Sequence, residues 1–157
     1  MGREEFTERV LAVRNRLYRA AYLYLGSEAD ALEAVDEAVY QALRNLKKLR
    51  EPQFFETWLT RILINQCNKE LRRRRRFASV EELPETAVAE NFDHLPLKEA
   101  IQRLPEELRS VIILRYFADY TQAETADTLG IPQGTVATRQ RRALQLLRLE
   151  LGEEANI

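Results

Sequence analysis

The chain has 157 residues, of which 45% are hydrophobic and 31% are charged, a composition typical of a folded soluble protein rather than a disordered one. Its formal net charge of −1 neither requires nor excludes a nucleic-acid partner. The sequence has neither a signal-peptide pattern at its start nor an apolar run of about 18 residues, so we expect a cytoplasmic protein that does not insert into a membrane.

The first half of the chain predicts three amphipathic helices. In the first, between about residues 6 and 25, apolar residues recur at spacings of three and four, which indicates one buried helix face. These residues are Val10, Val13, Leu17, Ala21 and Tyr24. Gly26 is expected to end this helix and Ser27 to cap the next one, with Asp30 placed for an approximate capping box.

The second and third helices complete a small bundle over residues 1–76. The apolar stripe of the second helix is expected to be Leu32, Val35, Val39, Leu43 and Leu46. Pro52 suits the first turn of the third helix, which runs into the basic segment Lys69–Arg76. Its apolar face is expected to consist of Phe55, Trp58, Leu59, Ile62 and Leu63.

Residues 77–96 are predicted to be a linker between two domains. The segment holds five acidic residues and no Lys or Arg, together with Pro84 and Pro96. Its apolar residues are few and irregularly spaced, which is typical of a domain boundary. The predicted fold is therefore all-α, with two small helical domains joined by an acidic linker.

The second half, residues 97–157, predicts a helix-turn-helix. Short helices are expected at 97–104 and 106–117, separated by Pro105. The next helix begins with a capping box of Thr121 and Glu124, and the turn Gly130-Ile131-Pro132 separates it from a last helix that ends near Leu149. The inward-facing residues of these two helices are expected to be Ala123, Ala126, Leu129, Val136, Ala143, Leu144 and Leu147.

The last helix has the composition of a DNA-recognition helix. Gln133–Arg148 carries four arginines and no acid, and such a helix presents polar side chains to bases and phosphates. Its outward-facing residues are expected to be Ala137, Thr138, Arg141 and Arg142, with Arg139, Arg142 and Arg148 placed for phosphate. The alternative interpretation is an ordinary helical hairpin with solvated arginines.

A second basic segment follows an aromatic-rich stretch. Lys69–Arg76 contains six basic residues, five of them consecutive arginines, which suits a polyanion. Phe54, Phe55 and Trp58 precede it, and aromatic rings beside cations suit unstacked single-stranded bases. The same rings also suit a hydrophobic core, and both uses are compatible on different faces of one helix.

Three parts of the chain, taken in order, resemble the extracytoplasmic-function sigma factors of bacterial RNA polymerase. The acidic segment 27–38 is similar to their polymerase-docking helix, and Phe55–Asn65 with the arginine run resembles their promoter-melting region. Leu104–Phe117 together with Gly130–Val136 resembles their other DNA-binding domain. The resemblance covers almost the whole chain and implies a non-enzymatic transcription initiation factor that binds core RNA polymerase and promoter DNA, single- and double-stranded. It also implies control by an anti-sigma factor.

The resemblance also implies roles for single residues. Asn65 matches the position that reads a flipped base of the minus-ten element, and the segment 49–54 matches the pocket around that base. The residues implied to contact the minus-ten element are Phe54, Trp58, Arg61, Asn65, Lys69, Arg72 and Arg73. Those implied to contact the minus-thirty-five element are Thr135, Ala137, Thr138, Arg139, Arg141 and Arg142. The polymerase-docking residues are Asp36, Glu37 and Tyr40.

Two residues depart from the family pattern. Ala137 stands where a basic residue is common, and Lys69 stands where an acid is frequent. Both departures bear on which promoter sequence is read and not on the class of protein.

No residue pattern predicts a catalytic, cofactor or metal site. His94 is the only histidine, Cys67 is the only cysteine, and there is no glycine-rich phosphate loop. A single cysteine also excludes an intrachain disulfide and favours a reducing compartment. Two alternatives stay open at this point: a free-standing helix-turn-helix regulator that needs no polymerase, and a helical adaptor that binds only proteins.

Overall fold

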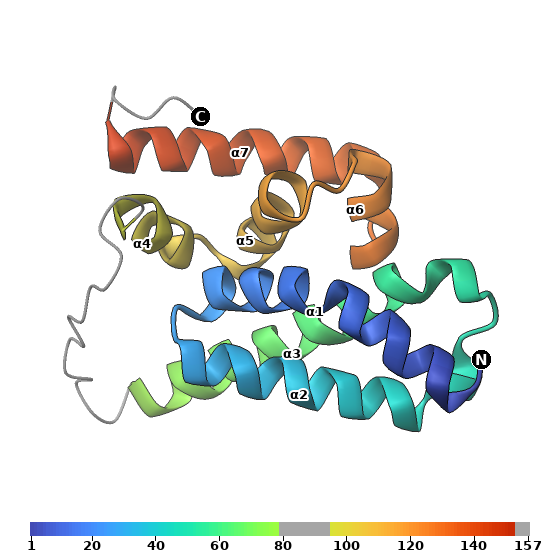
Figure 1. Ribbon diagram of the computed structural model, residues 1–157. Helices are drawn as coiled ribbons and strands as arrows, with labels where there is room; N and C mark the ends of the chain where they lie inside the picture. The colour runs from blue at the N-terminus through green and yellow to red at the C-terminus, as the bar shows by residue number, and fades with distance from the viewer. Residues whose placement is uncertain (79–94, 153–157) are drawn as a thin grey trace.

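The computed structural model describes residues 1–78 and 95–152, and all regular structure in these residues is helical (Figure 1). The α-helices are α1 (Arg3–Leu25), α2 (Glu28–Arg44), α3 (Phe55–Ala78), α4 (Leu95–Arg103), α5 (Glu106–Ile112), α6 (Gln122–Leu129) and α7 (Gln133–Leu151). The short 3₁₀ turns η1 (Leu46–Lys48) and η2 (Pro52–Phe54) connect α2 to α3, and the π-helical turn η4 (Ile113–Phe117) extends α5. Most of the predicted linker, together with His94, lies outside the described residues.

Local signals set the ends of α1 and α2 as predicted. Gly26 has φ 76°, a left-handed conformation that favours glycine, and its amide donates to the carbonyl of Tyr22. The Ser27 hydroxyl accepts a hydrogen bond from the amide of Asp30 at 3.3 Å. Only this half of the expected capping box forms, because the Asp30 carboxylate pairs with Arg74 of α3 instead.

The buried face of α1 is the predicted one, and that of α2 agrees with the prediction at Val35, with Val39, Leu43 and Leu46 partly buried against the core, but not at Leu32. The residues that α2 buries are Ala31, Ala34, Val35, Ala38 and Ala42. Leu32 lies about 100° around the helix from Ala31 and is 46% exposed, so its predicted place in the stripe is wrong. Small alanine side chains allow α2 to pack closely against both α1 and α3, and this contact outweighs the burial of one leucine.

The helix-turn-helix forms as predicted. The Thr121 hydroxyl accepts from the Glu124 amide at 3.0 Å, and the Glu124 carboxylate accepts from the Thr121 amide at 2.9 Å, which completes the capping box. Gly130 has φ 68° and ends α6 in the left-handed conformation. The core between α5, α6 and α7 consists of Val111, Ala126 and Val136, with Leu129 and Ile131 packed against it.

One face of α6 differs from the expectation. Ala123 is exposed, and Thr125 and Thr128 are buried although threonine is polar. Their burial is explained by the packing of α6 on α3, which gives α6 two covered sides. The prediction that Ala123 lies on the core face of this helix was therefore wrong.

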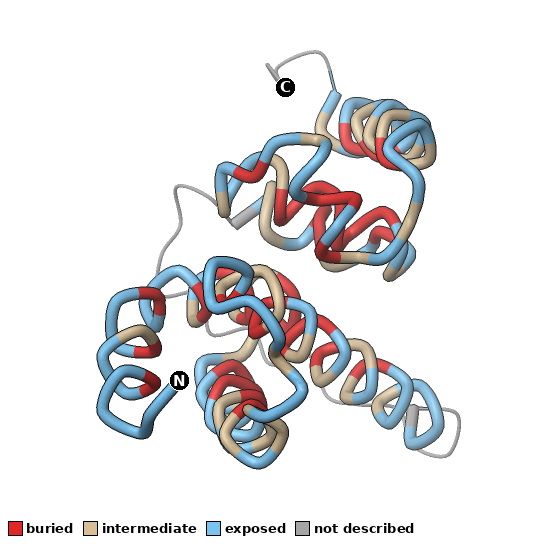
Figure 2. Tube along the Cα trace, turned by 90° about the vertical axis from the view of Figure 1, so that its right-hand side faces the viewer, coloured by how far each residue is buried: buried red, intermediate tan, exposed pale blue. Residues whose placement is uncertain are grey.

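The two helical domains stack on one another. Figure 1 shows α4, α5, α6 and α7 above α1, α2 and α3, and Figure 2 shows buried residues in both layers. A hydrophobic cluster runs through both domains, joining Tyr24, Leu63 and Cys67 of the first to Ile101 and Leu104 of the second. The first domain thus has two buried sides, one within its own bundle and one towards the second domain.

Burial of Cys67 gives a simple check of this core. Cys67 is 0% exposed, and burial raises the pKa of its thiol to about 12. We expect a thiol reagent at pH 8 to leave Cys67 of the native chain unmodified and to modify it fully in denaturant. A Leu11→Cys variant, at an exposed position of α1, should gain one rapidly reacting thiol. Equal reaction rates for Cys67 and the introduced cysteine would contradict the placement of Cys67.

Candidate nucleic-acid interface

Helix α3 presents a polar face whose residues are spaced along successive turns. Phe55, Leu59 and Leu63 are buried in the bundle, and they fix the orientation of the helix. The exposed residues that follow at helical spacing are Arg61, Asn65, Lys69 and Arg72. The side chains predicted to meet the minus-ten element therefore share one side of α3 and are not scattered around it.

The aromatic residues before this face divide between core and surface. Phe54, at the end of η2, is exposed, whereas Phe55 is buried and packs edge-on against Phe6 with ring centroids 5.6 Å apart. Trp58 is half-buried, with its ring 6.2 Å from that of Phe55. Phe55 is thus a core residue, and Phe54 and Trp58 are the rings with surface left for stacking.

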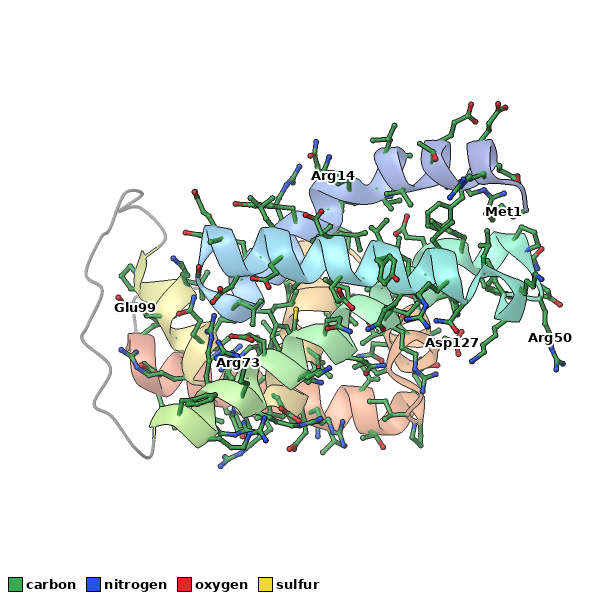
Figure 3. The ribbon with its side chains drawn as sticks, turned by 90° about the horizontal axis from the view of Figure 1, so that it is seen from below. Met1, Arg14, Arg50, Arg73, Glu99 and Asp127 are labelled. Atoms are coloured by element: carbon green, nitrogen blue, oxygen red, sulfur yellow. The ribbon has the colours of Figure 1, made fainter. Side chains whose placement is uncertain are left out.

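The arginine run has two different environments. Arg74 is half-buried, donates to the carbonyl of Leu25 at 2.8 Å and pairs with Asp30, so it fastens the end of α3 to the junction of α1 and α2. Arg72 and Arg73 remain exposed, and their ion pairs with Glu106 and Glu70 lie at the surface. Figure 3 shows Arg73 among nitrogen-bearing side chains gathered on the C-terminal half of α3. Surface ion pairs are weak, so they leave these guanidinium groups available to phosphate.

Helix α7 exposes three of the four residues predicted to face outward, and the fourth, Ala137, is half-buried. Val136, Ala143 and Leu147 are buried, and Leu144 is only partly buried. Thr138, Arg141 and Arg142 are exposed, whereas Thr135, Ala137 and Arg139 are half-buried.

A hydrogen-bond network that the sequence did not reveal holds α7 against η4 and the residues that follow it. Arg115 donates from Nε to Gln140 Oε1 at 3.0 Å and from Nη1 to the carbonyl of Tyr120 at 2.5 Å. Gln140 in turn donates to the hydroxyl of Tyr116 at 3.0 Å. Arg115 thus positions the recognition helix. Arg115 lies in the stretch Leu104–Phe117 that resembles the family, but this role could not be predicted, because its partners come from two other segments of the chain.

The two candidate DNA-binding faces meet in the folded chain. Arg61 and Asn65 of α3 line the same pocket, of about 160 Å³, as Arg139 of α7. The other residues that line it are Ile64, Asn68, Glu106, Glu107, Ser110, Thr128, Leu129 and Ile131. This juxtaposition could not be predicted from the sequence, because the two faces lie more than 70 residues apart in the chain.

An acidic surface lies on the opposite side of the first domain. Asp36, Glu37 and Tyr40 are all exposed on α2, which lies away from α6 (Figure 1). The guanidinium of Arg44 lies 5.7 Å from the centre of the Tyr40 ring. The three predicted docking residues thus form one accessible patch, separate from the basic faces of α3 and α7.

Other kinds of site find no support in residues 1–78 and 95–152. These residues contain no group of three or more His, Cys, Asp and Glu that could hold a metal ion. Within the same ranges, no helix combines the length and apolarity needed to cross a bilayer. A polar helix face, a helix-turn-helix with a basic recognition helix and a separate acidic patch define the class as a bipartite, all-α DNA-binding protein of transcription.

Comparisons with known proteins place the chain within this class. The family models for Sigma-70 region 2 and Sigma-70, region 4 match residues 10–77 and 100–149. RNA polymerase sigma factor SigV of Bacillus subtilis is 31% identical over 87% of this chain and 85% of its own length. ECF RNA polymerase sigma factor SigM of Mycobacterium tuberculosis is 32% identical over 87% of this chain and 72% of its own length. The chain belongs to the sigma-70 family, in its extracytoplasmic-function subfamily, as the sequence resemblance predicted.

Solved structures share the fold. The sigma factor RpoE of Bartonella quintana, in complex with the anti-sigma factor NepR, has a TM-score of 0.79 and 21% identity, covering 97% of this chain and 99% of its own. CnrH in complex with the cytosolic domain of CnrY has a TM-score of 0.75 and 25% identity, covering 96% and 89%. The all-α, two-domain fold predicted from the sequence is confirmed.

Proposed function

We propose that this sigma factor docks on core RNA polymerase through α2, opens the minus-ten element with α3 and reads the minus-thirty-five element with α7. Residues 1–76 would form the docking and melting domain and residues 97–157 the second DNA-binding domain, with 77–96 as the linker. The observation that carries the proposal is the separation of an acidic patch on α2 from polar, basic faces on α3 and α7. The chain itself catalyses no reaction in this mechanism and holds no cofactor.

Strand opening is assigned to Asn65 and its neighbours on α3. The Asn65 side chain both donates and accepts hydrogen bonds, so it can bind the pairing edge of a base that has left the stack. Unstacking costs a few kcal/mol, which stacking at about 1–3 kcal/mol per base can offset. Phe54 and Trp58 offer ring surface for such stacking, and Arg61, Lys69, Arg72 and Arg73 hold the strand by its phosphates.

Duplex recognition is assigned to the exposed face of α7. Thr138 and Arg141 would reach base edges in the major groove, and Arg139 and Arg142 would bind phosphates on either side. Thr135 and Ala137 lie at the start of the same face, where Ala137 supplies apolar contact and no charge. We expect the DNA affinity contributed by α7 to depend only weakly on salt concentration, because the helix carries few phosphate-binding arginines.

Control by an anti-sigma factor is part of the proposal. Two structures that share this fold are complexes: RpoE is bound to the anti-sigma factor NepR, and CnrH is bound to the cytosolic domain of CnrY. We expect a comparable protein to cover the DNA-binding faces of α3 and α7 in the cytoplasm, where core polymerase is found.

Reconstituted transcription tests the proposed function. Purified chain is mixed with core polymerase free of sigma subunits and with genomic fragments, and run-off transcripts are mapped. The expected result is initiation at defined sites that share two sequence elements. A chain that supports no transcription but shifts duplex DNA alone would instead be a free-standing helix-turn-helix regulator, and one that binds no DNA under any condition would be a protein-binding adaptor.

Charge reversal on α2 tests the docking surface. Asp36→Arg is expected to weaken association with core polymerase at least about tenfold, because like charges brought together at an interface cost several kcal/mol. Fluorescence anisotropy of labelled chain, titrated with core polymerase, measures the change. Glu8→Arg, an equal charge change at an exposed position of α1, is the control and should bind normally. Normal binding of Asp36→Arg would remove this patch from the docking surface.

A further inference from the structure

We infer that the pocket between the two domains is a binding site for a small phosphate monoester of the sugar phosphate class. The pocket, of about 160 Å³, lies between α3, the start of α5 and the turn that joins α6 to α7. The site goes beyond the proposed function, because its ligand is a small molecule and not promoter DNA or polymerase. Only its effect on transcription rests on the proposed function.

Two arginines that line the pocket have no partner within residues 1–78 and 95–152. Arg61 extends from α3 and Arg139 from α7, and neither forms an ion pair or a hydrogen bond with any of these residues. By contrast, Arg72, Arg73 and Arg74 of α3 each pair with a carboxylate. Two unpaired cations at one pocket favour an anion, and favour two negative charges over one.

The turn of the helix-turn-helix is shaped to leave room for the Arg61 guanidinium. Gly130 has φ 68°, and a Cβ atom at this position would lie 3.1 Å from Nη2 of Arg61. The apolar side chains of Leu129 and Ile131 line the pocket on the same side. Their presence lowers the local dielectric constant, which strengthens the attraction between the guanidinium and a bound anion.

Two asparagines of α3 add uncharged donors to the lining. The side-chain oxygen of Asn68 accepts from the hydroxyl of Tyr24, and no described residue accepts from its amide nitrogen. The Asn65 amide lies one turn earlier and is exposed. A phosphate monoester carries a charge of about −1.5 to −2 at pH 7 and three acceptor oxygens, so it can use donors from several side chains at once.

The acidic residues of the pocket restrict what the phosphate carries. Glu106 is paired with Arg72 at 3.1 Å and with Arg75 at 3.7 Å, whereas Glu107 is exposed and has no ion pair in the described part of the chain. An unpaired carboxylate can accept a hydrogen bond from a hydroxyl, which favours a hydroxylated ester over inorganic phosphate. The pocket is also smaller than the about 300–1,000 Å³ that drug-sized ligands occupy, so the ester group is small.

Buried hydrogen bonds hold the two walls of the pocket in place. On one side, the hydroxyl of Tyr120, a residue only 6% exposed, lies 2.9 Å from the hydroxyl of Thr60. On the other, Arg109 is 7% exposed and donates to the carbonyl of Tyr24 at 2.7 Å. A pocket whose walls are already ordered binds a small ligand with little cost of reorganisation.

Occupation of the pocket would compete with promoter DNA. Arg61 and Asn65 are assigned to the minus-ten element and Arg139 to the minus-thirty-five element, and all three line the pocket. A phosphate ester bound to the free chain should therefore lower transcription initiation. The same ester added to an open complex should have no effect, because DNA already contacts these side chains.

Calorimetric titration of the full-length chain with ribose 5-phosphate tests the site. We expect one ligand to bind per chain, inorganic phosphate to bind more weakly, and ribose without phosphate not to bind. The affinity should fall below about pH 6, where the phosphate takes up its second proton.

Variants of the two arginines locate the ligand. Arg61→Gln and Arg139→Gln are each expected to weaken binding of ribose 5-phosphate at least about tenfold, because each removes charge-assisted hydrogen bonds. Arg73→Gln removes the same charge from an exposed position of α3 outside the pocket, and it should keep the wild-type affinity. Circular dichroism of each variant checks that the helices are intact.

The outcomes separate this site from the proposed function. Absence of ribose 5-phosphate binding to the wild-type chain, or equal affinities of the three variants, would overturn the inference. Affinity for inorganic phosphate equal to that for ribose 5-phosphate would overturn the assignment of an ester. Binding that leaves run-off transcription unchanged would refute the competition with DNA. A chain that binds the ester but initiates no transcription without it would refute the proposed function and support the site.

Discussion

Replacement of Asn65 by alanine is expected to reduce promoter opening by about 5- to 150-fold, the effect of losing base contacts worth about 1–3 kcal/mol. Asn65 lies on the exposed face of α3, one turn after Arg61, and alanine cannot bind the edge of an extruded base. The contact forms only when the base has left the duplex. The loss should therefore appear in strand opening and not in assembly with polymerase.

Permanganate reactivity of unpaired thymines measures the opening, and anisotropy measures polymerase binding. Gln66→Ala removes an amide side chain from the next position of the same helix, where it faces a different direction, and serves as the matched control. Open-complex formation by Asn65→Ala at the wild-type rate would refute the role assigned to Asn65.

Removal of two arginines from the recognition helix is expected to change the salt dependence of promoter binding. In the double variant Arg139→Ala, Arg142→Ala, the slope of log K against log salt should become shallower by about 1.8, because each phosphate contact contributes about 0.9. Binding at low salt should weaken for all sequences alike, since phosphate contacts carry no base information.

The measurement is a salt series of polymerase holoenzyme on a duplex that contains the minus-thirty-five element. Arg14→Ala with Arg19→Ala removes the same charge from the exposed side of α1 and should keep the wild-type slope. If the two double variants give the same slope, Arg139 and Arg142 are solvated residues of a helical hairpin.

Local features of the fold were predictable because they depend on neighbouring residues. The ends of α1 and α6 follow from Gly26 and Gly130, and the capping box at Thr121 follows from two side chains three positions apart. The buried stripe of α1 follows from helical periodicity alone. These signals need no knowledge of the rest of the chain.

Other features depended on partners distant in sequence and could not be predicted. Leu32 satisfies helical periodicity as well as Ala31 does, but the neighbouring helices fit closely only against the alanine face. Thr125 and Thr128 are buried because α6 packs on α3. Their polar side chains would not lead one to predict this burial from the sequence.

The functional residues also fall into two groups, those that could be predicted from the sequence and those that could not. Composition indicated that α3 and α7 carry basic faces, but it could not distinguish Arg74, which fastens α3 to the first two helices, from exposed Arg72 and Arg73. Tyr120 and Arg109 belong to no recognisable pattern, since their importance lies in contacts with residues 60 and 85 positions earlier in the chain.

The most direct test of the proposed mechanism is site-specific photocrosslinking of the polymerase holoenzyme to a promoter found by run-off transcription. A photoreactive residue is placed at position 65 in one preparation and at position 138 in another, and the crosslinked bases are mapped. The expected result is one site in the opened region and a second in duplex DNA about 25 base pairs upstream, or about 85 Å at about 3.4 Å per base pair. Crosslinks from both positions to the same base pairs, or from neither position to the promoter, would contradict it.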